Sequence, residues 1–105
     1  MEIKIVILNW NGRAHLERFL PSVVSHSTGA SVVVADNGSD DDSAAFLRKH
    51  YPQVELLLLD KNYGYAEGYN RALTQVDAEY VVLLNSDVEV TPHWLEPLLD
   101  YMDTH

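Results

Sequence analysis

Four clusters of asparagine, aspartate and glycine interrupt an otherwise apolar sequence, and their side chains are suited to binding a polar ligand or a metal ion. Each cluster follows directly on a run rich in Val, Ile and Leu. The clusters are Asn9-Trp10-Asn11-Gly12, Asp36-Asn37-Gly38-Ser39, Asp60-Lys61-Asn62 and Asn85-Ser86-Asp87. Amide and carboxylate oxygens accept hydrogen bonds from hydroxyl and imide groups, and carboxylates also hold divalent cations. These four segments are therefore the candidate binding loops.

Asp36 stands at the end of the second apolar run, where a carboxylate could accept a hydrogen bond from a ribose hydroxyl or a base imide. A structural interpretation competes with this one. The pair Asn37-Gly38 favours a turn, and the three aspartates after Ser39 suit the start of a helix. The turn explains Gly38 and the later aspartates better than it explains Asp36, so both interpretations of Asp36 stay open.

Asp87 follows the fourth apolar run and is a candidate metal ligand. Magnesium and manganese are commonly held by one or two carboxylates while the rest of the shell is left to water and substrate phosphates. The structural alternative is a capped turn before Pro92. Whether Glu89 joins the metal site stays open.

The segment from Asn62 to Asn70 spaces glycines along a strand-to-helix junction, where free backbone amides favour an anion. Gly68 has a second explanation, since a glycine inside a helix also permits close packing against a sheet. The three tyrosines of this segment could stack on a base or sugar, although packing is their more frequent role. The five histidines show no metal-ligand spacing and are interpreted as structural.

The apolar runs predict four strands, at residues 3–8, 31–35, 54–59 and 80–84. They lack alternating polar positions, which is typical of strands covered on both faces. Helical patterns predict helices at residues 14–25, 43–50, 65–76 and 92–102, the last capped by Thr91 with Pro92 in its first turn. Strands that alternate with helices predict an α/β fold with an open, mainly parallel, Rossmann-like sheet and helices on both faces. A strand order 3-2-1-4 would bring the first and fourth loops to the switch point, where such sheets bind ligands.

Length and charge restrict the function. A chain of 105 residues is one domain at most. The net charge of −9 and only seven basic residues argue against a nucleic-acid partner. A phosphate-bearing ligand on so acidic a chain favours a divalent metal as neutraliser.

There is no cysteine, signal peptide or membrane-spanning segment, which predicts a cytoplasmic location. The apolar run at 80–84 would form an exposed sheet edge, so we expect the amino-terminal piece of a larger domain that self-associates in isolation.

The four clusters together resemble the inverting nucleotide-sugar glycosyltransferases of family 2, which have the GT-A fold, and among them the rhamnosyltransferase-like members. The resemblance covers the whole chain in order. It is carried by Ile5-Val6-Ile7-Leu8-Asn9-Trp10-Asn11-Gly12, Val33-Val34-Ala35-Asp36-Asn37-Gly38-Ser39, the segment from Asn62 to Asn70, and Leu83-Leu84-Asn85-Ser86-Asp87.

The resemblance implies a role for each matched residue. Asn9 and Asn11 would stand in the first nucleotide-contacting loop, and Asp36 would contact the base or ribose. Asp87 would be the metal-carrying aspartate of an Asp-x-Asp motif whose first position is here Asn85. The pocket beside the diphosphate would be shaped by Asn62, Gly64 and Asn70.

The implied activity is transfer of a sugar from a nucleoside-diphosphate sugar to a glycan, lipid-linked or other hydroxyl acceptor, assisted by Mn or Mg. In such enzymes a carboxylate base deprotonates the acceptor, and the family's base lies beyond residue 105. Residues 1–105 would therefore be the nucleotide-sugar-binding part, with no catalytic residue of their own and no turnover.

In the full protein a position at the inner face of the membrane is compatible with this function. The alternative is a non-catalytic binding or interaction module of the same fold. The sugar, the acceptor and the base, among uridine, guanosine and deoxythymidine, stay open.

Overall fold

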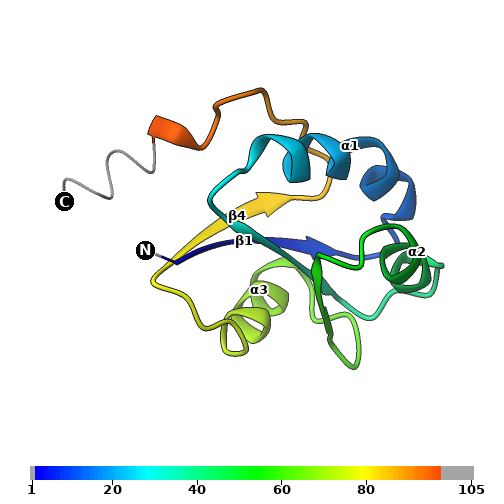
Figure 1. The fold of residues 1–105 in the computed structure, drawn as a ribbon. Helices are drawn as coiled ribbons and strands as arrows, with labels where there is room; N and C mark the ends of the chain where they lie inside the picture. The colour runs from blue at the N-terminus through cyan, green and yellow to red at the C-terminus, as the bar shows by residue number, and fades with distance from the viewer. Residues whose placement is uncertain (1, 98–105) are drawn as a thin grey trace.

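The computed structural model describes residues 2–97 and contains one parallel sheet of four strands in the order β3-β2-β1-β4 (Figure 1). The strands are β1 (Ile3–Asn9), β2 (Ser31–Asp36), β3 (Glu55–Leu58) and β4 (Tyr80–Asn85). β1 is central and pairs in parallel with both β2 and β4. The predicted α/β class and the strand order 3-2-1-4 are confirmed.

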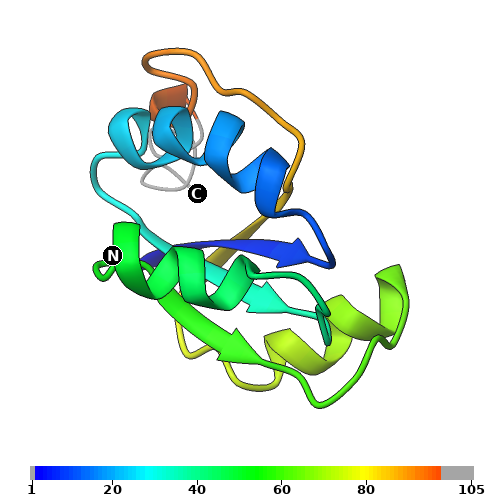
Figure 2. The same ribbon diagram turned by 90° about the vertical axis from the view of Figure 1, so that its right-hand side faces the viewer.

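Helices cover both faces of the sheet (Figure 2). They are α1 (Arg13–His26), α2 (Ser43–His50) and α3 (Tyr65–Leu73). The larger core cluster lies under α1 and α2, with Ile5, Ile7, Val34, Leu20 and Leu47 at its centre. The smaller cluster joins α3 to the middle strands through Tyr69 and Ala72. The ends of the strands are thereby fixed from both sides.

The expectation that every strand is covered on both faces is wrong for β4. Val81 and Leu83 are 36% and 50% exposed, whereas Val82 and Leu84 pack against the α1 side. On the other face, α3 packs against Val6, Val33 and Ala35 of the two central strands. A helix about 10 Å wide spans roughly two strands spaced about 4.8 Å apart, so α3 leaves one face of β4 open.

The predicted fourth helix is wrong at its start. Residues 92–93 form a turn in which Trp94 N donates to Thr91 O at 3.2 Å, and helical structure begins at Glu96. The remainder of the predicted helix, from residue 98, lies outside the described residues. Contacts with α1 explain the difference, because Leu95 is buried in the core and the Trp94 indole donates to Ser27 Oγ at 3.0 Å. Such tertiary contacts override a local preference for helix.

Candidate functional site

The carboxyl ends of the strands bring the first, second and fourth clusters to one edge of the sheet. Asn9 is in register with Asp36 on β2, and Leu8 is in register with Asn85 on β4. The third cluster follows β3, whose last residue Leu58 is in register with Asp36. In parallel sheets this edge is where ligands bind.

Asp36 is 5% exposed and accepts three hydrogen bonds. Its Oδ1 accepts from Asn9 Nδ2 at 3.0 Å and from Ser39 Oγ at 2.6 Å, and its Oδ2 accepts from Ser39 N at 3.1 Å. Asn9 itself is 0% exposed, and its Oδ1 has no hydrogen-bond partner within residues 2–97. Asn9 thus meets the carboxylate of Asp36 and is closed off from solvent.

Asn11 connects the first loop to the second. Its backbone has a φ of 48°, its N–H donates to Ser39 Oγ at 2.9 Å, and its Oδ1 accepts from Asp40 N at 2.7 Å. Asp41 adds a second link by accepting from Arg13 N at 3.1 Å and Ser43 N at 3.0 Å. Burial raises the pKa of the Asp41 carboxyl, but the hydrogen bonds from Ser43 and Arg13 outweigh it and the net shift is downward. An ionised Asp41 therefore holds the two loops together.

Asn37 lies in the second predicted loop, where the sequence predicts a turn-forming role for it. It is 2% exposed and its amide donates to Asn62 Oδ1 at 3.1 Å and Gly64 O at 3.0 Å. Its Oδ1 accepts from Tyr63 N at 3.0 Å. Asn37 therefore fixes the third loop, and the Asn62 side-chain oxygen is used inside the protein.

Two tyrosines of α3 reach the end of β4. The Tyr69 hydroxyl donates to Leu84 O at 2.9 Å and accepts from Leu8 N at 3.4 Å. The Tyr65 hydroxyl donates to Asn85 Oδ1 at 2.9 Å, and its ring packs edge-on against Tyr69 with centroids 5.0 Å apart. Burial raises the pKa of Tyr69. α3 is thereby attached across the junction of β1 and β4.

A hollow opens between these loops. It is lined by Leu8, Trp10, Asn37, Asn62, Gly64 and Tyr65. Trp10 and Tyr65 are 51% and 66% exposed, so each offers an aromatic surface beside polar loop atoms. Trp10 lies in the first predicted loop, but the sequence analysis assigns it no role. A tryptophan between two asparagines in a loop already indicates a surface on which a ligand could stack.

Asp87 and Asn70 stand apart from the hydrogen-bond network. Both are exposed, and within residues 2–97 neither side chain makes a hydrogen bond. Asn70 lies on the sixth position of α3, away from the hollow's lining. No three His, Asp or Glu side chains in the described part of the chain are grouped so that they could hold a metal ion. The structure brings together Asn9, Asn11 and Asp36 as one cluster, with Asn62 and Gly64 joined to it through Asn37.

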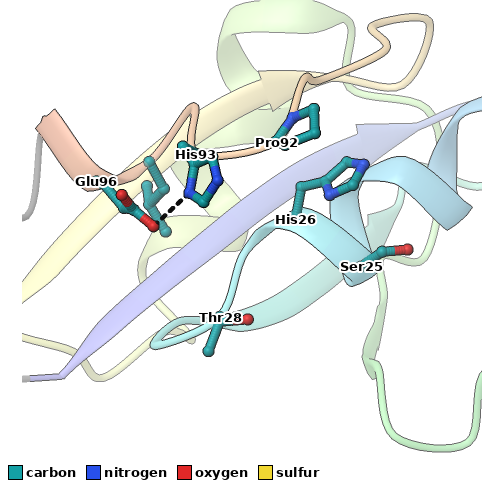
Figure 3. Close-up of a pocket in the computed structure, with 7 residues that line it drawn as sticks. Ser25, His26, Thr28, Pro92, His93 and Glu96 are labelled. Carbon is teal, nitrogen blue, oxygen red and sulfur yellow. Dashed lines mark hydrogen bonds and ion pairs between the residues drawn. The ribbon is translucent and has the colours of Figure 1, made fainter.

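A second pocket lies beside the end of α1 and contains two of the five histidines (Figure 3). His93 Nδ1 and Glu96 Oε1 are 2.7 Å apart there, and His26 lies on the opposite wall near Pro92. Because α1 runs back from the carboxyl end of β1, this pocket is at the amino ends of the strands, remote from the loops. No helix in residues 2–97 is both long and apolar enough to cross a membrane.

Fold and site define an open parallel α/β domain of the kind that binds ligands at the carboxyl ends of its strands. The sequence assigns this domain to a family. The chain belongs to glycosyl transferase family 2, whose sequence model matches residues 4–105. It is 34% identical over 110 residues to the N-acetylglucosaminyl-diphospho-decaprenol L-rhamnosyltransferase of Mycobacterium tuberculosis, with 93% of this chain and 36% of that protein covered. The chain thus spans about a third of that relative's length.

Solved structures share the fold. The crystal structure of S. aureus TarS 1-349 in complex with UDP superimposes with a TM-score of 0.85 at 23% identity, covering 100% of this chain and 33% of that chain. The mannosyltransferase PcManGT from Pyrobaculum calidifontis, in complex with GDP-Man and Mn2+, has a TM-score of 0.71 at 23% identity, covering 84% and 28%. The predicted GT-A type of fold is confirmed.

Proposed function

We propose that this chain is the donor-binding part of a glycosyltransferase that transfers a sugar from a nucleoside-diphosphate sugar with inversion. The observation that carries the proposal is the cluster of Asp36, Asn9 and Ser39 beside an aromatic-lined hollow at the strand ends, in a family 2 chain. Asp36 would accept a hydrogen bond from the nucleotide base or ribose. Trp10 would stack on the base, since an exposed indole offers a large flat surface.

Asp87 is the proposed metal ligand. One exposed carboxylate after β4 fits magnesium or manganese, because these ions are held by one or two carboxylates and by substrate phosphates. Bound there, the metal would neutralise charge on the leaving diphosphate. The Mn2+ in the PcManGT complex supports the use of a divalent metal. Asn85 would contribute a neutral amide near the same place, and Asn62, Gly64 and Asn70 are proposed to shape the pocket beside the diphosphate.

The proposed acceptor is a lipid-linked glycan, as the name of the mycobacterial relative suggests. A cytoplasmic protein at the inner face of a membrane would meet such an acceptor. We propose that residues 1–105 bind donor without turnover, since they match only 36% of the mycobacterial relative. The uncovered apolar face of β4 further supports self-association of the isolated chain.

An NMR titration of the labelled chain tests donor binding. Uridine, guanosine and deoxythymidine diphosphates are added with and without magnesium, and amide shifts are followed. We expect shifts at Trp10, Asp36, residues 62–65 and Asp87 that grow with the metal. If no amide signal shifts when the nucleotides are added, the proposal is contradicted and the alternative, a non-catalytic module, is favoured. The neutral Asn85 at the first position of the metal motif also supports that alternative.

A further inference from the structure

The carboxylate of Asp36 has little accepting capacity left. Each carboxylate oxygen offers about two lone-pair sites. Oδ1 uses both, for Asn9 Nδ2 and Ser39 Oγ, while Oδ2 uses one for Ser39 N. Among residues 2–97, one accepting site on Oδ2 therefore remains unused.

The surroundings keep the carboxylate in this orientation. Asn9 is 0% exposed and lies against Gly12, where an added Cβ would come within 2.5 Å of Asn9 Oδ1. The Asn9 amide therefore has little room to turn away. The Ser39 hydroxyl is fixed in turn by Asn11 N, which donates to it at 2.9 Å. Oδ1 consequently stays occupied when a ligand arrives.

Nucleotide bases differ in what they offer to such a carboxylate. Guanine presents two parallel donors, N1–H and N2–H, which match a carboxylate with both oxygens free. Uracil and thymine present a single N3–H between two carbonyl oxygens, which needs one accepting site. Cytosine and adenine place a ring nitrogen lone pair beside their amino group, and that lone pair would face the carboxylate unfavourably. A donor left without an acceptor in a closed site weakens binding.

We propose that this site selects the imide-bearing pyrimidine nucleotides, those of uracil or thymine, over guanine nucleotides, and that Asn9 and Ser39 are the positioning residues that impose the choice. They act by occupying Asp36 Oδ1. The inference rests on the proposed function, namely that Asp36 meets the base. Asn9 would then act through Asp36 and would not contact the nucleotide directly.

The test is a calorimetric and NMR titration of the chain with UDP, dTDP, GDP and CDP in magnesium. We expect the tighter of UDP and dTDP to bind about tenfold or more tightly than GDP, with CDP as weak as GDP, because a single charged hydrogen bond is at stake. Comparing the UDP and dTDP arms shows which imide base the site prefers. GDP binding as tightly as both would overturn the inference.

The variant Ser39→Ala frees one site on Oδ1 while the backbone donor to Oδ2 stays. We expect the preference for UDP over GDP to fall at least threefold, since two donors can then be accepted. Ser39→Thr keeps the hydroxyl and should retain the original ratio. Ser43→Ala is the matched control, because its hydroxyl donates to Asp41 and does not touch Asp36.

A merely structural role for Ser39 would weaken all nucleotides alike, and an unchanged ratio in folded Ser39→Ala would overturn the inference. The amide spectrum of each variant reports whether it is folded. Tightest binding of GDP would contradict base selection while leaving donor binding intact. Failure of all four nucleotides to bind would instead refute the proposed function, and the inference would fall with it.

Discussion

The side-chain amide of Asn37, at the end of β2, donates to Asn62 Oδ1 at 3.1 Å in the loop after β3. The same amide donates to Gly64 O, and Asn37 Oδ1 accepts from Tyr63 N. One buried side chain therefore makes three hydrogen bonds across two loops that are far apart in sequence. The third loop takes its position in the candidate site from Asn37.

Replacing Asn37 should cost considerable stability. We expect Asn37→Ala to lower the free energy of unfolding by roughly 2–4 kcal/mol, because the three part-buried hydrogen bonds of this side chain are lost. Urea denaturation followed by circular dichroism measures this. Asn70→Ala is the matched control, since Asn70 is exposed on α3, and its effect should stay within about 0.5 kcal/mol. Equal effects of the two substitutions would argue against the role of Asn37.

Gly38 and Gly64 form a second matched pair. Both have positive φ, 73° and 79°. A Cβ at Gly38 would lie 2.5 Å from the Lys61 carbonyl carbon, whereas a Cβ at Gly64 would meet nothing within 4 Å. Gly64→Ala should therefore cost only the backbone term, about 1–3 kcal/mol at its φ of 79° and ψ of −177°, and Gly38→Ala clearly more. Thermal unfolding of both variants gives the comparison, and a larger loss at Gly64 would contradict the loop packing described.

Asp87 should determine the metal dependence of nucleotide binding. In Asp87→Ala we expect magnesium to lose its effect on the affinity for nucleoside diphosphates, while metal-free binding changes little, because the carboxylate acts through the cation. Titrations with and without magnesium measure the difference. Glu89→Ala serves as the comparison and also answers whether Glu89 joins the site. Undiminished metal dependence in Asp87→Ala would count against the assignment.

Tyr69 should make stability sensitive to alkali. Burial raises its pKa above that of an unfolded tyrosine, so the stabilising contribution is complete below about pH 10 and is lost as the pH rises through the folded pKa. Tyr69→Phe should lower stability at neutral pH by about 1 kcal/mol and flatten the decline above about pH 10. Denaturation series across that range decide this. Parallel declines in both proteins would show that Tyr69 is not the titrating group.

The exposed apolar residues of β4 should drive self-association. Light scattering of the chain at increasing concentration is expected to show a mass above that of the monomer, since Val81 and Leu83 lie on an unpaired edge strand of the described sheet. Leu83→Lys should return the mass toward the monomer, because a charge there opposes pairing. A monomer at every concentration would refute the proposal.

The sequence was sufficient for the fold because the apolar runs and helical patterns are strong local signals. It failed where a tertiary contact decides: Trp94 and Leu95 bind α1 and displace the start of the last helix. It also could not show that Asn9 is buried against Asp36, or that Asn37 joins two loops. Both depend on which strands are neighbours, and no local pattern encodes the direction of an amide side chain.

Gly68 sets how wide the hollow beside Trp10 can be. A Cβ at this position would lie 2.8 Å from Asn37 Nδ2 and 2.9 Å from Leu8 Cδ2, so α3 sits as close to β1 and β2 as a helix without a side chain allows. Any larger residue would have to push aside the Asn37 amide and the Leu8 side chain, both of which line the hollow. The missing methyl group of Gly68 therefore keeps two walls of the hollow in their present positions.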